Sequence, residues 1–91
     1  HRYLKTTLYR DRSGRLLLSV RNETSLKVKN LLVLVGRRDA SGRIYRGALE
    51  RVPGTLPPGG SARIVTGISG VVSDKELRRY AAQVREAEVV K

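Results

Sequence analysis

The stretch LLLSVRNETSLKVKNLLVLVGRRD, from Leu16 to Asp39, reads as two apolar strands joined by a polar connection. Residues 15–21 alternate between an apolar face and a mixed face, as a half-buried strand does. Residues 27–38 are apolar on both faces, which indicates a central strand or one whose outer face is covered. Between them, Asn22-Glu-Thr-Ser25 favours a turn because such side chains hydrogen-bond to their own backbone.

This alternation predicts which side chains fill the core. Those expected to face it are Leu16, Leu18, Val20, Leu31, Val33 and Val35. Four apolar side chains are left pointing away from it, namely Leu17, Leu32, Leu34 and Val65. If nothing in the chain covers these four, they form an exposed apolar patch of the kind that marks a partner site. The alternative is that they are buried beneath a helix or within a two-sided core.

Turn signals divide the remaining chain into further short strands. Asp39-Ala-Ser-Gly42 predicts a tight hairpin, and Leu56-Pro-Pro-Gly-Gly60 predicts a sharp turn because proline fixes φ. We expect Pro53-Gly54 to end the strand that follows the hairpin. The further strands expected are 3–9, 43–52, 61–68 and 84–90.

The C-terminal part of the chain contains one helix signal. Ser73-Asp-Lys-Glu76 is a capping box, in which the serine accepts an early helical N–H and the glutamate reaches back. It predicts a short helix from residue 73 to about Tyr80. Residues 81–90 fit either a helical stripe or a closing strand. We favour the strand because a sandwich needs its last strand and because the Val89-Val90 pair suits a sheet.

Six or seven short strands separated by turn signals predict a mainly all-β fold. We expect one antiparallel, immunoglobulin-like β-sandwich over residues 1–91, with a short helix near 73–80. The Cys and Trp hallmarks of antibody domains are absent, so the likeness is one of architecture. The chain opens at His1 rather than Met, and we therefore expect it to be part of a longer protein.

Composition limits the possible functions. The 91 residues contain neither Cys nor Trp, which excludes disulfides and thiolate metal sites. The net charge of +11 favours anionic partners such as nucleic acid, lipid head groups or acidic protein surfaces. An arginine-rich composition also arises from a GC-rich genome, so charge alone does not decide. No apolar run approaches the roughly 20 residues that a membrane helix needs.

Catalytic, cofactor and metal sites are not expected. The single histidine is His1, so a Ser-His or Cys-His nucleophile pair is not available within the folded part. The acidic residues lie mostly in turns or beside arginine, as Asp11, Asp39 and Glu50 do. That placement is typical of solvated turn or ion-pair residues, and no spacing suggests a carboxylate metal site. We therefore expect a protein that is not an enzyme.

An arginine-rich hairpin is the best candidate for anion binding. Its basic residues are Arg37, Arg38, Arg43, Arg46 and Arg51. Alternation places the first two on opposite faces, but cross-strand neighbours are able to gather three of the five charges on one surface. Such a cluster binds phosphates or carboxylates through bidentate contacts. The alternative is a solvated sheet edge whose charge prevents edge-to-edge aggregation.

Nucleic-acid binding has weaker support. A domain that binds single-stranded nucleic acid uses aromatic rings on a sheet face to stack on the bases. Here Phe and Trp are absent, and the tyrosines are scattered over four segments. Non-specific binding to a phosphate backbone through charge remains an alternative.

The order of turn motifs resembles the small bacterial FxLYD-like sandwich domains of cell-envelope proteins. The matching residues are Val20-Arg-Asn22-Glu-Thr24, Val28, the strand Leu32 to Val35, Asp39-Ala-Ser-Gly42 and Leu56-Pro-Pro-Gly59. The resemblance covers roughly residues 14 to 70. Where the family has its aromatic signature, this chain has Val35-Gly-Arg-Arg38.

This resemblance implies a noncatalytic accessory domain that mediates protein–protein contact. It also implies a place in the bacterial periplasm or cell envelope, as part of a lipoprotein, a protease or a membrane-anchored chain. The expected partner is a protein, and an anionic surface is the alternative.

Overall fold

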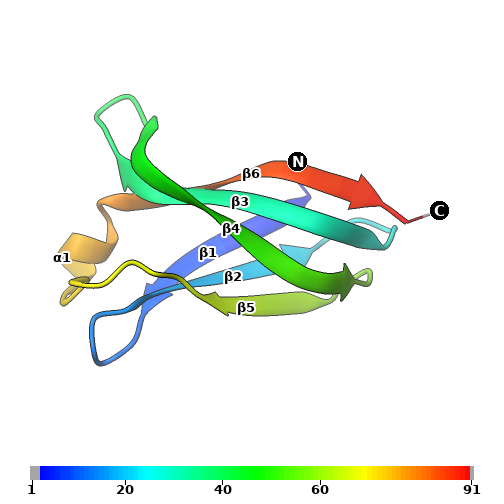
Figure 1. Cartoon of the computed structure of the whole chain (residues 1–91), viewed down its shortest axis with the longest axis horizontal. Helices are drawn as coiled ribbons and strands as arrows, with labels where there is room; N and C mark the ends of the chain where they lie inside the picture. The colour runs from blue at the N-terminus through cyan, green and yellow to red at the C-terminus, as the bar shows by residue number, and fades with distance from the viewer. Residues whose placement is uncertain (1–2, 91) are drawn as a thin grey trace.

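The computed structural model describes residues 3–90, which form two packed three-stranded antiparallel sheets (Figure 1). Sheet A has the order β1-β2-β5, built from Leu4–Arg10, Leu16–Asn22 and Ser61–Val65. Sheet B has the order β4-β3-β6, built from Ile44–Leu56, Val28–Arg38 and Tyr80–Val89. One short helix, α1 (Asp74–Leu77), precedes β6. The predicted all-β sandwich is confirmed.

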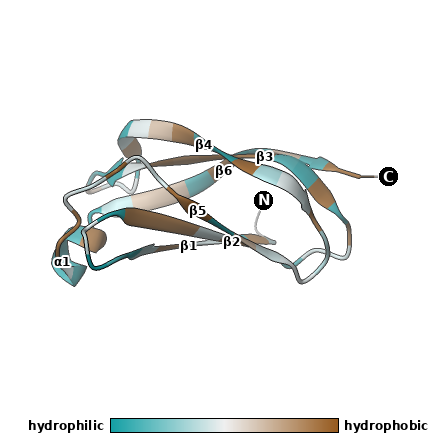
Figure 2. Ribbon diagram, turned by 60° about the horizontal axis from the view of Figure 1, so that its bottom comes forward, coloured by the Kyte–Doolittle hydropathy of each residue, from teal (hydrophilic) through white to brown (hydrophobic). Residues whose placement is uncertain are grey.

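The core lies between the two sheets. All the side chains expected there from β2 and β3 are buried, and Leu18, Val20, Val33 and Val35 have no exposed surface. Figure 2 shows hydrophobic segments in both layers. Each fully buried Val or Leu contributes about 1.5–3 kcal/mol to the free energy of unfolding. A core of branched aliphatic side chains therefore holds the layers together without a disulfide.

Strand β4 continues through Pro53-Gly54 to Leu56, so the prediction that these residues end it is wrong. Two features of the strand explain the difference. It lies at the edge of sheet B, where a proline need not donate to a neighbouring strand. It also carries a β-bulge, because Lys29 pairs with Thr55 whereas Leu31 pairs with Val52. The bulge places both Val52 and Leu56 in the core.

Strand β5 ends at Val65 rather than at the predicted Ile68, because the chain there leaves the sheet and closes one end of the sandwich. The Thr66 hydroxyl and backbone N–H both donate to the carbonyl of Leu16, at 2.8 and 3.1 Å. Val71 donates its N–H to the carbonyl of Gly14 at 2.8 Å, and its side chain is fully buried. The segment after β5 is therefore part of the packed structure.

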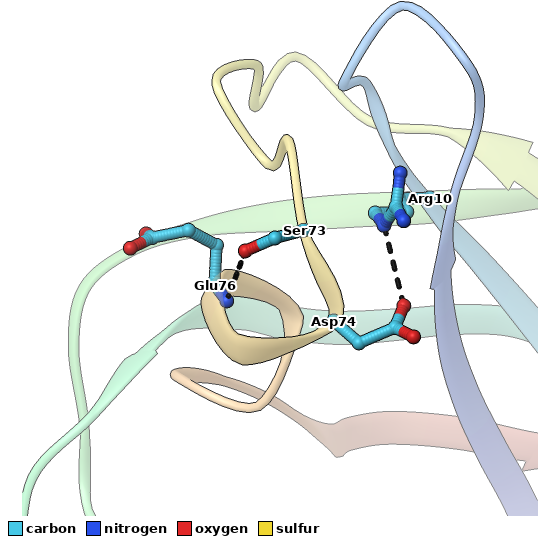
Figure 3. Close-up of polar contacts among 4 residues, drawn as sticks. All are labelled: Arg10, Ser73, Asp74 and Glu76. Carbon is cyan, nitrogen blue, oxygen red and sulfur yellow. Dashed lines mark hydrogen bonds and ion pairs between the residues drawn. The ribbon is translucent and has the colours of Figure 1, made fainter.

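Helix α1 is a single turn joined to the sandwich (Figure 3). The Ser73 hydroxyl accepts the Glu76 N–H at 3.1 Å, as the capping box predicts. The predicted return bond from Glu76 is wrong, because that carboxylate lies 3.7 Å from Arg79 Nη1 instead. Asp74 lies 3.4 Å from Arg10 Nε at the end of β1. The helix ends at Leu77 rather than near Tyr80, and the closing strand that we favoured runs from Tyr80 to Val89 rather than over 84–90.

Candidate interaction surfaces

The turn of the arginine-rich hairpin is built around the Asp39 carboxylate. Asp39 Oδ1 accepts the Ser41 hydroxyl at 2.7 Å, the Ser41 N–H at 2.9 Å and the Arg43 N–H at 3.0 Å. Gly42 has φ of 86°, which residues other than glycine rarely adopt. The bond from Ser41, followed by that from the Arg43 backbone, lowers the pKa of Asp39. This carboxylate stabilises the turn.

The sequence contains this turn twice. Asp11-Arg-Ser-Gly-Arg15 joins β1 to β2 with the same bonds that Asp39-Ala-Ser-Gly-Arg43 uses between β3 and β4. The pKa of Asp11 is likewise lowered, chiefly by its bond from Ser13. Both turns lie at the end of the sandwich that carries α1 (Figure 1). The pattern D-x-S-G-R is thus a local unit that builds a hairpin independently of its position.

Arg37 is held between two tyrosines. It follows Val33 and Val35 on the inward face of β3, opposite Tyr45 of β4 and Tyr80 of β6. Its guanidinium carbon lies 5.6 Å from the centroid of the Tyr80 ring, a cation–π contact. A hydrogen bond with the Tyr45 side chain raises the pKa of Arg37. Arg37 therefore joins three strands at the end of the core.

The other four arginines of the hairpin are exposed and spread along sheet B. Arg38 pairs with Ile44, Arg43 closes the turn, and Arg46 lies in a bulge with φ of 49°. Arg51 lies opposite Leu32, six residues along β3 from Arg38, which is roughly 20 Å at about 3.3 Å per residue. The five charges therefore do not form one cluster, and anion binding by this set stays a prediction.

At the base of the hairpin, two glycines allow the backbones of β3 and β4 to approach closely. Between the pairs Val35–Ala48 and Arg37–Tyr45, β4 has one residue more than β3. A Cβ atom on Gly36 would lie 2.6 Å from the Cα of Gly47, so the backbones approach too closely for any other residue. The side chains of Leu34 and Ile44 lie over this pair, because each would contact such an added Cβ. Bulges of this kind redirect a strand.

A hollow of about 490 Å³ lies between the turn of this hairpin and β6. We call it the sheet B groove, and its lining includes Leu34, Arg43, Ile44, Ala81, Gln83 and Arg85. Residue spacing gave no signal for it, because the two arginines come from strands that are far apart in the sequence. Antiparallel pairing of β3 with both neighbours brings them to one place.

The four predicted apolar residues lie on two different surfaces. Leu17 and Val65 are cross-strand neighbours on the outer face of sheet A, where Val65 is 67% exposed. Leu32 and Leu34 lie on the outer face of sheet B and are half-buried. Helix α1 contacts β1 and does not cover them. The structure thus splits the set into two pairs on opposite sides of the sandwich.

A second, more apolar hollow of about 210 Å³ lies at the end opposite α1. Tyr3, Leu26 and Val89 line it, and each is about half exposed, at 54%, 50% and 47%. These residues come from the start of the chain, the β2–β3 connection and the end of β6. Their separation in the sequence explains why no pattern predicts this pocket.

Asn22 is completely buried and joins two connections at that same end. Its side-chain amide donates to the carbonyls of Leu26 and Leu56, at 2.8 and 3.0 Å. Its side-chain oxygen accepts the Thr24 N–H and hydroxyl, at 2.9 and 2.6 Å. The Asn22-Glu-Thr24 sequence is also a glycosylation sequon, but a glycan on this amide is incompatible with these bonds.

Within residues 3–90, no three His, Cys, Asp or Glu side chains lie close enough to hold a metal ion. Over the same residues, no helix is long and apolar enough to cross a membrane. His1 lies outside the described residues.

No family model, curated protein or solved structure matches this chain.

Proposed function

We propose that the chain is a noncatalytic interaction domain that binds an acidic protein partner. The observation that carries this proposal is an excess of positive charge, of which few side chains are paired with a carboxylate of the chain itself. The net charge is +11, and within residues 3–90 only Lys5, Arg10 and Arg79 lie within ion-pair distance of a carboxylate. A surface of one sign attracts and orients a partner of the opposite sign.

A protein partner is favoured over nucleic acid by the state of the tyrosines. Binding of single strands needs aromatic faces that are free to stack on bases. Here the Arg63 guanidinium lies over the Tyr9 ring at 6.0 Å, and Arg37 lies over Tyr80 at 5.6 Å. The alternative is a basic module whose arginine-rich hairpin binds nucleic acid or anionic lipid through charge.

The noncatalytic part of the proposal is supported by what the acidic side chains do. Asp11 and Asp39 each accept three hydrogen bonds within their own turn. Asp74 and Glu76 lie beside Arg10 and Arg79. A general acid or base needs a carboxyl group that faces a substrate.

Relation to the FxLYD-like domains and a place in the bacterial periplasm or cell envelope belong to the same proposal. Two observations support them. If the strands are lettered A, B, C, C′, E and F, the sheets A-B-E and C′-C-F have the order of an immunoglobulin-type sandwich. The turn motifs at Asn22–Thr24 and Asp39–Gly42, on which the resemblance depends, both form hydrogen-bonded turns.

Binding of three anionic probes at two salt concentrations tests this function. The probes are a peptide repeating Glu-Ser-Leu-Ser, random-sequence DNA, and vesicles containing anionic lipid. If the domain contacts six or more phosphates of the DNA, its affinity for DNA should fall about 10³-fold between 50 and 200 mM salt. We expect the peptide to be the tightest ligand at the higher salt, because its apolar contacts are not screened. Tighter binding of DNA or vesicles there would overturn the proposal, as would failure to bind the peptide at low salt.

A further inference from the structure

We infer that the sheet B groove binds an extended acidic segment of the partner, in which an Asp or Glu is followed two residues later by a branched aliphatic residue. This inference rests on the proposed function and specifies where and what the domain binds. Its starting point is the position of the groove, between the hairpin turn and β6 on the outer face of sheet B. Its volume of about 490 Å³ is sufficient for a few side chains.

The charge of the groove selects an anion. Arg43 contributes a guanidinium from the hairpin and Arg85 contributes one from β6. Within the described part of the chain, neither guanidinium lies in an ion pair or donates a hydrogen bond. No Asp or Glu lines the groove. The planar fork of arginine matches a carboxylate in bidentate fashion, so an acidic side chain is the complement of either guanidinium.

The apolar surface of the groove selects the second residue. Leu34 and Ile44 line it, and both are half-buried. Both lie over the close contact between Gly36 and Gly47. An aliphatic side chain of the partner would bury its apolar surface against them.

The geometry of an extended chain gives the spacing. Side chains at positions i and i+2 of a strand-like segment point to the same side. An acidic residue and an aliphatic residue at that spacing are therefore able to reach the arginines and the apolar surface together. A flat phosphate backbone has no counterpart for Leu34 and Ile44, which favours an acidic peptide over nucleic acid in this groove.

NMR titration with the Glu-Ser-Leu-Ser repeat peptide tests the inference. We expect amide shifts to change at Ser41 to Ile44 and at Ala81 to Arg85. Arg43→Gln and Arg85→Gln should each weaken binding about tenfold, the loss of one charge-assisted contact. Arg51→Gln is the matched control, because it removes the same charge from the same outer face but lies outside the groove. It should leave the affinity within about twofold.

A second variant tests whether a carboxylate inside the groove blocks binding of the peptide. Gln83→Glu keeps the size of an exposed side chain and places a carboxylate inside the groove. It should compete with the peptide and weaken binding about as much as Arg43→Gln. The peptide with Gln in place of Glu should bind all forms equally weakly. Spectra of the free variants show whether each is folded.

The outcomes distinguish this inference from the function on which it rests. If the peptide binds the native chain but Arg43→Gln and Arg85→Gln behave like Arg51→Gln, the groove is not the site and the proposed function stands. If shifts instead map to the outer face of sheet A, the groove is equally excluded. If the native chain does not bind the peptide, the proposed function itself fails. If random DNA displaces the peptide from the groove at moderate salt, the acidic-protein assignment is wrong.

Discussion

At the scale of single residues, Asn22 is a fully buried polar side chain that makes four hydrogen bonds. It connects the β2–β3 turn to the end of β4 through four side-chain hydrogen bonds. Its backbone also bonds to Gly59 and Gly60. We expect Asn22→Ala to lower the free energy of unfolding by about 3 kcal/mol, since buried carbonyl and N–H groups lose their partners. Urea denaturation measures this loss.

Asn22→Asp is the matched control, since it keeps the acceptor for Thr24 but loses both donated bonds. A buried carboxylate beside the Leu26 and Leu56 carbonyls has its pKa raised by desolvation and repulsion. Stability from a raised acid pKa is present at low pH and is lost as the pH rises. Asn22→Asp should therefore be least stable relative to the native chain at neutral pH. Equal losses at pH 4 and pH 7 would contradict this account.

Asp11 and Asp39 give the stability of the chain an acid dependence. Their pKa values are lowered in the folded chain, so the stabilisation that they supply is complete above the unfolded value of about 3.9. It is lost as the pH falls through the folded values. We expect carboxyl NMR titration to show that the pKa values of both groups lie below the ordinary value of an aspartate.

Each serine supplies the largest part of this shift. Ser41→Ala should raise the pKa of Asp39 toward its ordinary value and leave Asp11 unchanged. Ser13→Ala should have the opposite pattern. If either variant moves both groups, the two turns are not the independent units described above.

At the scale of elements, the β3–β4 hairpin depends on the contact between Gly36 and Gly47. Gly36→Ala should lower the free energy of unfolding by about 1–3 kcal/mol, the usual cost of overpacking, because the new methyl group meets backbone. Gly67→Ala is the control, since nothing lies within 4 Å of an added Cβ there and its φ is not positive. That change should leave stability equal or raise it by about 0.4–1 kcal/mol. Thermal unfolding of the two variants checks the pair.

The elements also show where sequence patterns succeed. The inward faces of β2 and β3 follow from simple alternation, because a period of two is a property of the strand itself. The extent of β4 does not follow from alternation. Pro53-Gly54 would end a central strand, but in an edge strand such as β4 it is accommodated by a β-bulge. Whether a strand lies at the edge or at the centre of a sheet depends on which other strands pair with it. The same holds for Val71, whose burial depends on the Gly14 turn from another part of the chain.

At the scale of the whole molecule, excess positive charge opposes folding. Lys5 and Arg21 are directly opposite one another on the outer face of sheet A, and β1, β2 and β5 contain no acidic residue. Raising salt from 0.01 to 0.1 M shortens the screening length from about 30 to about 10 Å. We expect the melting temperature to rise over that range. A fall would mean that the ion pairs outweigh the repulsion.

The substitution Arg21→Glu tests whether the destabilising repulsion comes from the Lys5–Arg21 pair. It places a carboxylate opposite Lys5, which already lies 3.4 Å from Glu23, and should raise stability at low salt by about 0.2–1 kcal/mol because the like-charge cross-strand pair is removed. The gain should shrink as salt is added. Arg12→Glu makes the same change in net charge within an exposed turn, and it should gain less. Equal gains would assign the effect to net charge rather than to the Lys5–Arg21 pair.

Local patterns alone determined the strand class, the inward side chains of β2 and β3, the D-x-S-G hairpin and the start of the helix. Each of these depends on side chains within a few positions of one another, so the information is present in a short segment. Tertiary structure alone decided that Leu17 and Val65 face away from Leu32 and Leu34, that Arg37 lies between two tyrosines, and that Arg43 and Arg85 line the same groove. Those relations depend on which strands become neighbours, and strand pairing is set by packing of the complete core.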